Sequence, residues 1–201
     1  MSLDNAAMTI YGDSISGNCL KIKFVADHLG LPYEWVETDV MKKQSRTPEF
    51  LAMNPAGQVP VVVFPGHGPL AQSNAIILHL AEGSELIPSD AFERAKMYEW
   101  MFWEQYTHEP AIAVLRFHKH YLKKTDINPD LPGKCGSVLT LMNNHLAGRH
   151  YFAGRTLSLA DVALVAYTRF SHEAGLDLNR YPHVRDWVRR VETDLNIEHA
   201  A

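Results

Sequence analysis

The segment NPAGQVPVVVF, residues 54–64, carries the strongest structural signal in the chain. Its second half is a run of β-branched and apolar residues, which is typical of a buried strand. Pro60 opens that strand, where it cannot donate to the sheet ladder. Because Xaa–Pro bonds tolerate the cis form far better than other peptide bonds, we expect a cis bond that turns the backbone N–H and C=O of Val59 outward. Those groups could pair with an extended ligand; an edge strand or a simple turn is the alternative.

The residues before this segment predict a βαβ unit. Residues 9–11 form a short strand pattern, and 12–18 are small, polar and loop-like. Apolar residues then recur at helical spacing until Gly30 and Pro32 mark a helix end. Residues 33–36 are rich in strand formers.

The residues after the segment complete a ββα unit and then change character. A turn and a second strand lead to Ser73, which we expect to cap a helix reaching about Ala81. Gly, Ser and Pro break the pattern from Gly83 to Asp90, which indicates a linker. Beyond it only helical patterns follow. The first three patterns cover residues 93–109, where Pro110 marks the expected helix end, 112–122 and 135–146. A fourth helix is opened by Ser158, with Asp161 in a capping arrangement, and a fifth is opened by Pro182.

The chain is therefore expected to combine an α/β domain with an all-α domain. We place the first domain at residues 8–83, the linker at 84–90 and the helical domain at 91–198. Met1–Ala7 resembles a short leader before Met8 and is left out of the fold argument.

Composition excludes several classes of function. Hydrophobic residues make up 46% and charged residues 21%, with a net charge of −4. No basic run or basic aromatic helix is present, so we expect no nucleic-acid partner. No apolar run approaches the ~20 residues that span a membrane, and no secretory signal pattern opens the chain.

The cysteines and histidines give no sign of a metal site. Cys19 and Cys135 lie far apart and neither has a second cysteine nearby, which excludes a disulfide framework and a cysteine-based zinc cluster. His118 and His120 are the closest histidines, and their spacing places them on different faces of a helix. We expect no metal.

Two predicted helix starts carry polar residues that suit an anion. Ser73, after Gln72, stands at a helix N-terminus, which offers free N–H groups and partial positive charge to a carboxylate. Ser16 and Asn18 precede another helix, where a hydroxyl and the helix dipole would favour a thiolate or oxyanion. Ordinary helix capping is the alternative explanation for each serine, as most serines at helix starts are caps. Ser14 and Tyr11 are rival donors in the first loop.

In this order and spacing, three motifs are similar to those of the cytosolic glutathione transferases. EFLAMNPAGQVPVV resembles the segment leading to that family's cis proline, QSNAIILHLAE its glutathione-carboxylate segment, and SLADVALVAYTRF the helix cap of its second domain. The resemblance covers about residues 8–195. The first loop is similar to the zeta and theta-like branch, with a serine at Ser16, although Gly17 and Asn18 depart from the zeta loop.

The resemblance implies a thioredoxin-like first domain that binds glutathione as a substrate. Ser16 would donate a hydrogen bond to the thiolate. Val59, before Pro60, would pair with the cysteine backbone of glutathione. Ser73 would hold the γ-glutamyl carboxylate and Gln72 the amino group. The contacts expected for the glycine carboxylate are Gln58, Lys42 or Lys43.

The small hydrophobic electrophile would lie against the helical domain. Tyr106 is a candidate for the wall of an aromatic pocket, and Arg116 is a candidate for holding an anionic group of the electrophile. Packing in the aromatic core of a helical bundle is the alternative explanation for both residues. A cysteine at a helix N-terminus can have a low pKa, so Cys19 offers a disulfide-exchange alternative. Further candidates for electrophile contact, on the first helix of the helical domain, are Met101, Trp103 and His108.

The leading hypothesis is therefore a cytoplasmic, homodimeric enzyme that conjugates glutathione to small electrophiles. Glutathione-dependent isomerisation, or reduction of disulfides or peroxides, is a second enzymatic possibility. A binding module that retains the fold without catalysis is the third, because one fold hosts many functions.

Overall fold

The computed structural model describes residues 7–200, which form two compact units that divide between Glu82 and Gly83. The division falls next to the linker expected at residues 84–90. Almost all of the suggested leader lies outside the described residues.

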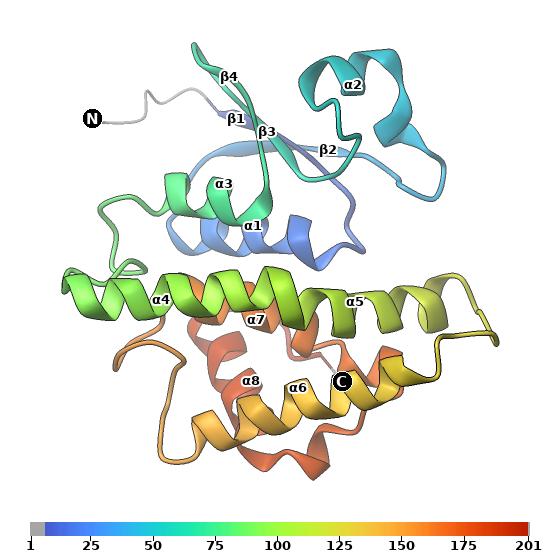
Figure 1. Cartoon of the computed structure of the whole chain (residues 1–201). Helices are drawn as coiled ribbons and strands as arrows, with labels where there is room; N and C mark the ends of the chain where they lie inside the picture. The colour runs from blue at the N-terminus through green and yellow to red at the C-terminus, as the bar shows by residue number, and fades with distance from the viewer. Residues whose placement is uncertain (1–6, 201) are drawn as a thin grey trace. The chain divides into compact units, whose positions relative to one another are not determined.

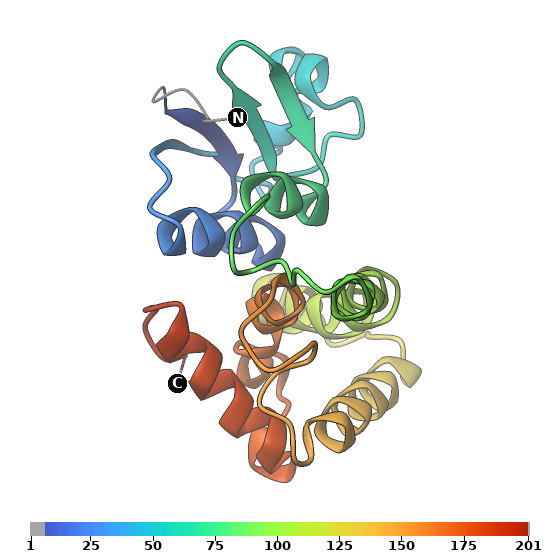
Figure 2. The ribbon, with the colours of Figure 1, turned by 90° about the vertical axis from the view of Figure 1, so that its left-hand side faces the viewer.

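The first unit is a four-stranded mixed sheet with helices, as the sequence predicted (Figure 1). Its strand order is β2-β1-β3-β4, with β1 parallel to β2 and antiparallel to β3, and β3 antiparallel to β4. Helices α1 and α3 pack side by side on one face of the sheet (Figure 2). The elements are β1 (Met8–Gly12), α1 (Gly17–His28), β2 (Tyr33–Glu37), α2 (Pro48–Met53), β3 (Val61–Phe64), β4 (Gly68–Ala71) and α3 (Ser73–Leu80). This confirms the thioredoxin-like βαβ–ββα prediction.

The sheet register brings three connections to one end of the sheet. Tyr11 near the end of β1 pairs with Val61 at the start of β3, and Val61 pairs with Ala71 at the end of β4. The loop after β1, the residues before β3 and the residues after β4 therefore emerge together.

The second unit is helical, as predicted. Every residue of α7 is buried, which makes α7 the central helix of the unit. No helix within residues 7–200 is both long and apolar enough to cross a membrane. The helices are α4 (Ala91–Trp103), α5 (Glu109–Arg116), α6 (Asp130–Leu146), α7 (Leu159–Thr168) and α8 (Pro182–Asp194).

Prolines do not end helices where the sequence pattern suggested. The chain stays helical past Pro110, which lies in the first turn of α5 and closely follows a π-helical turn, where the i→i−4 bonding pattern is already interrupted. A π-helical turn, Glu104–His108, joins α4 to α5, and another, Phe117–Tyr121, follows α5. The next helix starts at Asp130, earlier than expected, with Pro132 in its first turn.

Asp161 organises the core of the second unit. The capping box predicted for Ser158 and Asp161 is confirmed. The fully buried Asp161 carboxylate accepts hydrogen bonds from Ser158 Oγ at 2.8 Å, Phe152 N at 2.9 Å and Trp187 Nε1 at 2.9 Å. Burial raises the pKa of Asp161 to about 6, although the hydrogen bonds from these donors favour the charged form and lower the pKa. The carboxylate is thus ionised at neutral pH and ties α7 to α8.

We expect Asp161→Ala to lower the free energy of unfolding by about 3 kcal/mol, because buried N–H donors lose their acceptor. Urea denaturation measures the change. The matched control is Asp186→Ala, in which an exposed acid of α8 loses its surface pair with Arg185, and its change should stay below about 1 kcal/mol. Equal losses in the two variants would contradict the role of Asp161.

Candidate functional site

The candidate site lies at the end of the sheet where the three connections of the first unit meet. The loop after β1 leads to Ser16, and the Val59–Pro60 bond before β3 is cis. Gln72 and Ser73 directly follow β4. The register therefore gathers most of the glutathione-contact candidates named from the sequence.

Asp13 shapes the first loop and was not singled out from the sequence. It is 3% exposed, and its carboxylate accepts hydrogen bonds from Ile15 N at 3.0 Å and Val40 N at 2.8 Å. Its backbone carbonyl accepts from Ser16 N at 3.0 Å. An Asp directly after a strand and before a helix start is the signal that could have identified it.

Ser16 occupies the N-cap position of α1, but its side chain makes no capping hydrogen bond. The hydroxyl therefore lies at a helix N-terminus without capping the helix backbone, and its side-chain partner is the Cys19 thiol. By contrast, the rival Ser14 Oγ donates to Glu37 Oε1 at 3.1 Å. Tyr11 packs edge-on against Phe50, with ring centroids 6.5 Å apart. Ser16 is thus the best-placed hydroxyl in the loop.

Ser73 is the first residue of α3 and not its cap, which corrects the sequence-based expectation. The cap is Gln72, with φ of 72° and ψ of 109°, a left-handed backbone conformation that is costly for a residue with a side chain. This conformation brings the buried Ser73 to the helix start. Strain of this kind clusters at ligand-binding sites.

A buried lysine supports the N-terminus of α3. Lys21, on α1, is fully buried, and its Nζ donates to Ser73 Oγ at 3.4 Å and Asn74 Oδ1 at 3.3 Å. Ser73 Oγ in turn donates to Asn18 Oδ1 at 3.2 Å. We call Asn18, Lys21, Ser73 and Asn74 the α3 cluster. The sequence reasoning found Asn18 but missed Lys21, whose helical spacing from Gly17 and Val25 places it on the buried face of α1.

Cys19 does not have the environment of a reactive thiol. It is fully buried, and its Sγ accepts a hydrogen bond from Asp13 N at 3.3 Å. Burial raises its pKa to about 12, because the hydrogen bonds that favour the thiolate are outweighed by desolvation. The structure therefore argues against the disulfide-exchange role considered for Cys19. Cys135 is also buried, and desolvation raises its pKa to about 11.

The residues expected at a glycine carboxylate lie at the surface. Gln58 is exposed, and its backbone carbonyl accepts a hydrogen bond from Asn54 Nδ2 at 2.8 Å. Lys42 Nζ lies 2.9 Å from Asp39 Oδ2, with 76% of the lysine side chain exposed. Such an exposed pair is weak, so Lys42 can exchange Asp39 for another carboxylate at little cost.

Arg116 is a structural residue of the second unit, which corrects its expected role with an anionic electrophile. Its side chain is 5% exposed, with Nε 2.5 Å from Glu173 Oε2 and Nη2 donating to Tyr121 Oη at 2.8 Å. The guanidinium also stacks over Phe170, 4.3 Å from the ring centroid. Tyr106, in contrast, is 88% exposed.

The other candidates near Tyr106 are buried or half-buried. Met101 is 2% exposed and His108 is fully buried, with its Nε2 2.8 Å from Thr168 Oγ1. Trp103 packs edge-on against Trp100, with ring centroids 5.2 Å apart. Within the described part of the chain, no group of three or more His, Cys, Asp or Glu side chains is arranged to hold a metal ion.

Two family models match the chain, one on each unit. "Glutathione S-transferase, N-terminal domain" matches residues 6–82, and "Glutathione S-transferase, C-terminal domain" matches residues 110–194. Glutathione S-transferase 3 of Zea mays is 30% identical over 200 residues, which cover 92% of this chain and 89% of the relative.

Solved structures agree with these matches. A glutathione S-transferase from Pseudomonas fluorescens has a TM-score of 0.88 and 39% identity, covering 94% of this chain and 96% of its own. One from Xanthobacter autotrophicus has a TM-score of 0.87 and 41% identity, covering 92% and 93%.

We expect both thiols to resist alkylation by iodoacetamide in the native protein up to about pH 9, because the thiolate is the reactive form. Mass spectrometry measures the labelled fraction, and labelling in urea is the control that must modify both residues. Rapid labelling of native Cys135→Ser at pH 7 would show a reactive Cys19.

Proposed function

Because the chain belongs to the glutathione S-transferase family, we propose that it conjugates the thiolate of glutathione to small electrophiles. The observation that carries this proposal is the Ser16 hydroxyl at the N-terminus of α1, which makes no capping bond to the helix backbone. The proposal is also supported by the sheet register, which brings the loop bearing Ser16, cis Pro60 and the α3 cluster to one end of the sheet.

We propose that glutathione lies across this end of the sheet. Its cysteine backbone pairs with the main chain of Val59, as an added strand would. Its γ-glutamyl carboxylate accepts hydrogen bonds at the N-terminus of α3, from Ser73 and its backbone N–H. Gln72 contacts the amino group. Gln58, Lys42 or Lys43 receives the glycine carboxylate.

Lys21 acts in this proposal as a positioning residue beneath the carboxylate. A lysine ammonium has donors and no acceptor, so Ser73 Oγ must be the acceptor of their 3.4 Å contact. The Ser73 hydroxyl proton is then directed elsewhere, toward Asn18 Oδ1 in this structure. When a carboxylate arrives, the same proton turns to the ligand while Lys21 keeps the oxygen in place.

The chemical step needs a thiolate. A free thiol has a pKa of ~8.5, so only a few per cent is ionised at neutral pH. Lowering that pKa by about 2 units takes about 2.7 kcal/mol of differential stabilisation. One hydrogen bond to a charged acceptor contributes about 1.5–3 kcal/mol. The Ser16 hydroxyl and the dipole of α1 therefore suffice together, with Ser16 as donor rather than base.

The competing activities have less support. Reduction of disulfides through the protein's own cysteine is opposed by the burial and raised pKa of Cys19. A non-catalytic module would not need Ser16, Pro60 and Ser73 gathered at one place. We also propose that the chain belongs to the zeta and theta-like branch of the family, because Ser16 stands where that branch has its serine.

The remaining features of the proposal come from the family. They are a homodimer, a cytoplasmic location and an electrophile bound against the helical unit. Tyr106 is the exposed aromatic residue that we assign to electrophile contact.

We expect Ser16→Ala to raise the pKa of the bound glutathione thiol by about 1–2 units, because the thiolate loses a charge-assisted hydrogen bond. Ultraviolet absorbance of the thiolate against pH measures that pKa, and the pH–rate profile of conjugation should move with it. The control is Ser14→Ala, which removes a hydroxyl held by Glu37. An unchanged profile in Ser16→Ala with a shift in Ser14→Ala would reverse the assignment.

A further inference from the structure

The parallel pairing of β1 and β2 places two connecting segments side by side at the candidate site. Gly12 at the end of β1 pairs with Glu37 at the end of β2, and Thr38 N donates to Gly12 O at 2.8 Å just beyond that pair. Because parallel strands run in the same direction, the chain leaves both at the same edge of the sheet. The loop that leads to Ser16 and the segment 38–43 therefore start next to each other.

The backbone of Asp13 is held in place at the start of the first loop. A Cβ on the preceding Gly12 would lie 2.6 Å from the ring of Trp35 and 3.2 Å from the Cβ of Cys19, so a larger residue would displace the indole ring. Asp13 N donates to Cys19 Sγ at 3.3 Å, and Asp13 O accepts from Ser16 N at 3.0 Å. The side chain of Asp13 therefore starts from a fixed position beside Ser16.

The buried carboxylate of Asp13 joins the two segments. Its Oδ1 accepts from Ile15 N at 3.0 Å, within the first loop, and its Oδ2 accepts from Val40 N at 2.8 Å, in the second segment. A carboxylate that is 3% exposed must have hydrogen-bond partners, because burial without them is very costly. Each oxygen serves a different segment, so the position of one segment depends on that of the other.

The peptide of Val40 continues the connection into the turn that carries Lys42 and Lys43. Val40 O accepts from Lys43 N at 3.1 Å, and Lys43 has a left-handed backbone with φ of 60°. Both lysines are exposed and are candidates for the glycine carboxylate of glutathione. A path of hydrogen bonds therefore runs from Ser16 N through Asp13 and Val40 to this turn.

We propose that Asp13 is a positioning residue that couples the glycine-carboxylate end of the glutathione site to its thiolate end. The inference rests on the proposed function, with Ser16 as donor to the thiolate and Lys42 or Lys43 as partner of the glycine carboxylate. A carboxylate bound at the turn steadies the Val40 N–H, which holds Asp13, which holds the loop presenting the Ser16 hydroxyl. Binding energy from the remote end of the substrate thereby helps to ionise the thiol.

The charge of Asp13 acts against its positioning role, which makes the role testable. A negative charge near Ser16 disfavours a second negative charge on the substrate, so removing it would by itself lower the pKa of the bound thiol. Loss of positioning weakens the hydrogen bond from Ser16 and raises the same pKa. The direction of the shift therefore separates the two effects.

The test compares glutathione with glutathione amide, in which a carboxamide replaces the glycine carboxylate. Ultraviolet absorbance of the thiolate against pH gives the thiol pKa of each ligand, bound and free. In wild type we expect binding to lower the pKa of glutathione about one unit further than that of the amide, a coupling of typical size. Asp13→Asn should raise the pKa of bound glutathione by about one unit and remove the difference between the ligands, because one acceptor oxygen cannot serve both N–H donors.

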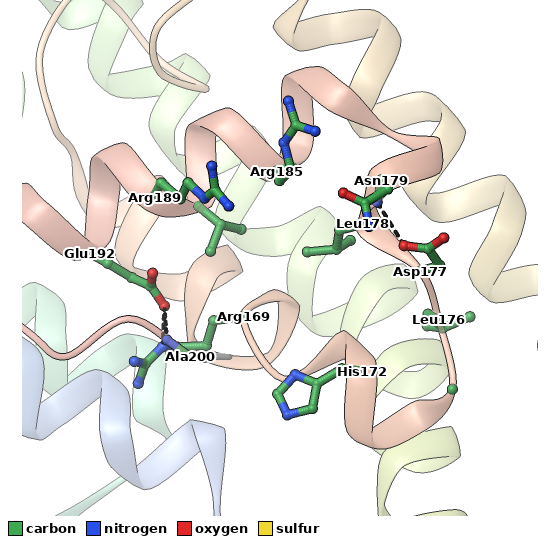
Figure 3. A pocket seen from close by; sticks show the side chains of 12 residues that line it. Arg169, His172, Leu176, Asp177, Leu178, Asn179, Arg185, Arg189, Glu192 and Ala200 are labelled. Carbon is green, nitrogen blue, oxygen red and sulfur yellow. Dashed lines mark hydrogen bonds and ion pairs between the residues drawn. The ribbon is translucent and has the colours of Figure 1, made fainter.

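The matched control is Asp177→Asn. Asp177 Oδ1 also accepts from the backbone N–H two residues along the chain, Asn179 N at 2.9 Å, but it lies beside a pocket of the second unit (Figure 3). This variant loses a carboxylate of the same local geometry outside the proposed glutathione site. Both thiol pKa values should stay as in wild type.

Three outcomes would overturn the proposal. An unchanged or lowered thiol pKa in Asp13→Asn would reject positioning by Asp13, while glutathione conjugation would stand. Equal lowering of the pKa of both ligands in wild type would reject the coupling, and this result does not depend on whether Asp13→Asn folds. No lowering of the pKa of glutathione bound to wild type would overturn the proposed function as well.

Discussion

The contact between Lys21 and Ser73 is the constraint on which the candidate site depends. A fully buried ammonium group must be hydrogen-bonded, because burying it alone would be very costly. It meets this requirement at the first residues of α3, through Ser73 and Asn74. Helix α3 is thereby fixed against α1 at the end of the sheet where the loop bearing Ser16 emerges. The left-handed backbone of Gln72 is sustained by the same arrangement, since strain persists only where the surroundings over-determine it.

In the proposed reaction, helix dipoles and a hydroxyl stabilise the thiolate of the substrate, where other enzymes use a general base or a cysteine of their own. Two helix N-termini of the first unit, at Ser16 and Ser73, present partial positive charge to the thiolate and the γ-glutamyl carboxylate of glutathione in the proposed complex. Such preorganised groups stabilise charge without a proton acceptor. The one cysteine near them, Cys19, is buried and protonated, so it does not compete with the substrate thiol.

Much of the fold followed from local patterns, and less of the site did. Gly30 and Pro32, the β-branched run before Phe64 and the capping pair Ser158 and Asp161 each act within a few residues, so their consequences could be predicted from the sequence. The helix end predicted at Pro110 was wrong, because the chain continues from α4 into α5 through a π-helical turn, where the i→i−4 bonding pattern that proline disrupts is already interrupted. Lys21 and Arg116 were missed or misassigned for another reason. Their partners, Ser73 and Glu173, lie more than fifty positions away in the chain, so only the tertiary structure brings them together.

The most direct test of the central claim is calorimetric titration with glutathione and with its analogue lacking the α-carboxylate of the γ-glutamyl residue, in wild type and in Lys21→Met. If the carboxylate binds at the α3 cluster, wild type should prefer glutathione at least about tenfold, because the analogue forgoes charge-assisted hydrogen bonds. Lys21→Met should lose most of that preference while retaining its affinity for the analogue. Equal binding of the two ligands by wild type, or no binding of either, would contradict the account.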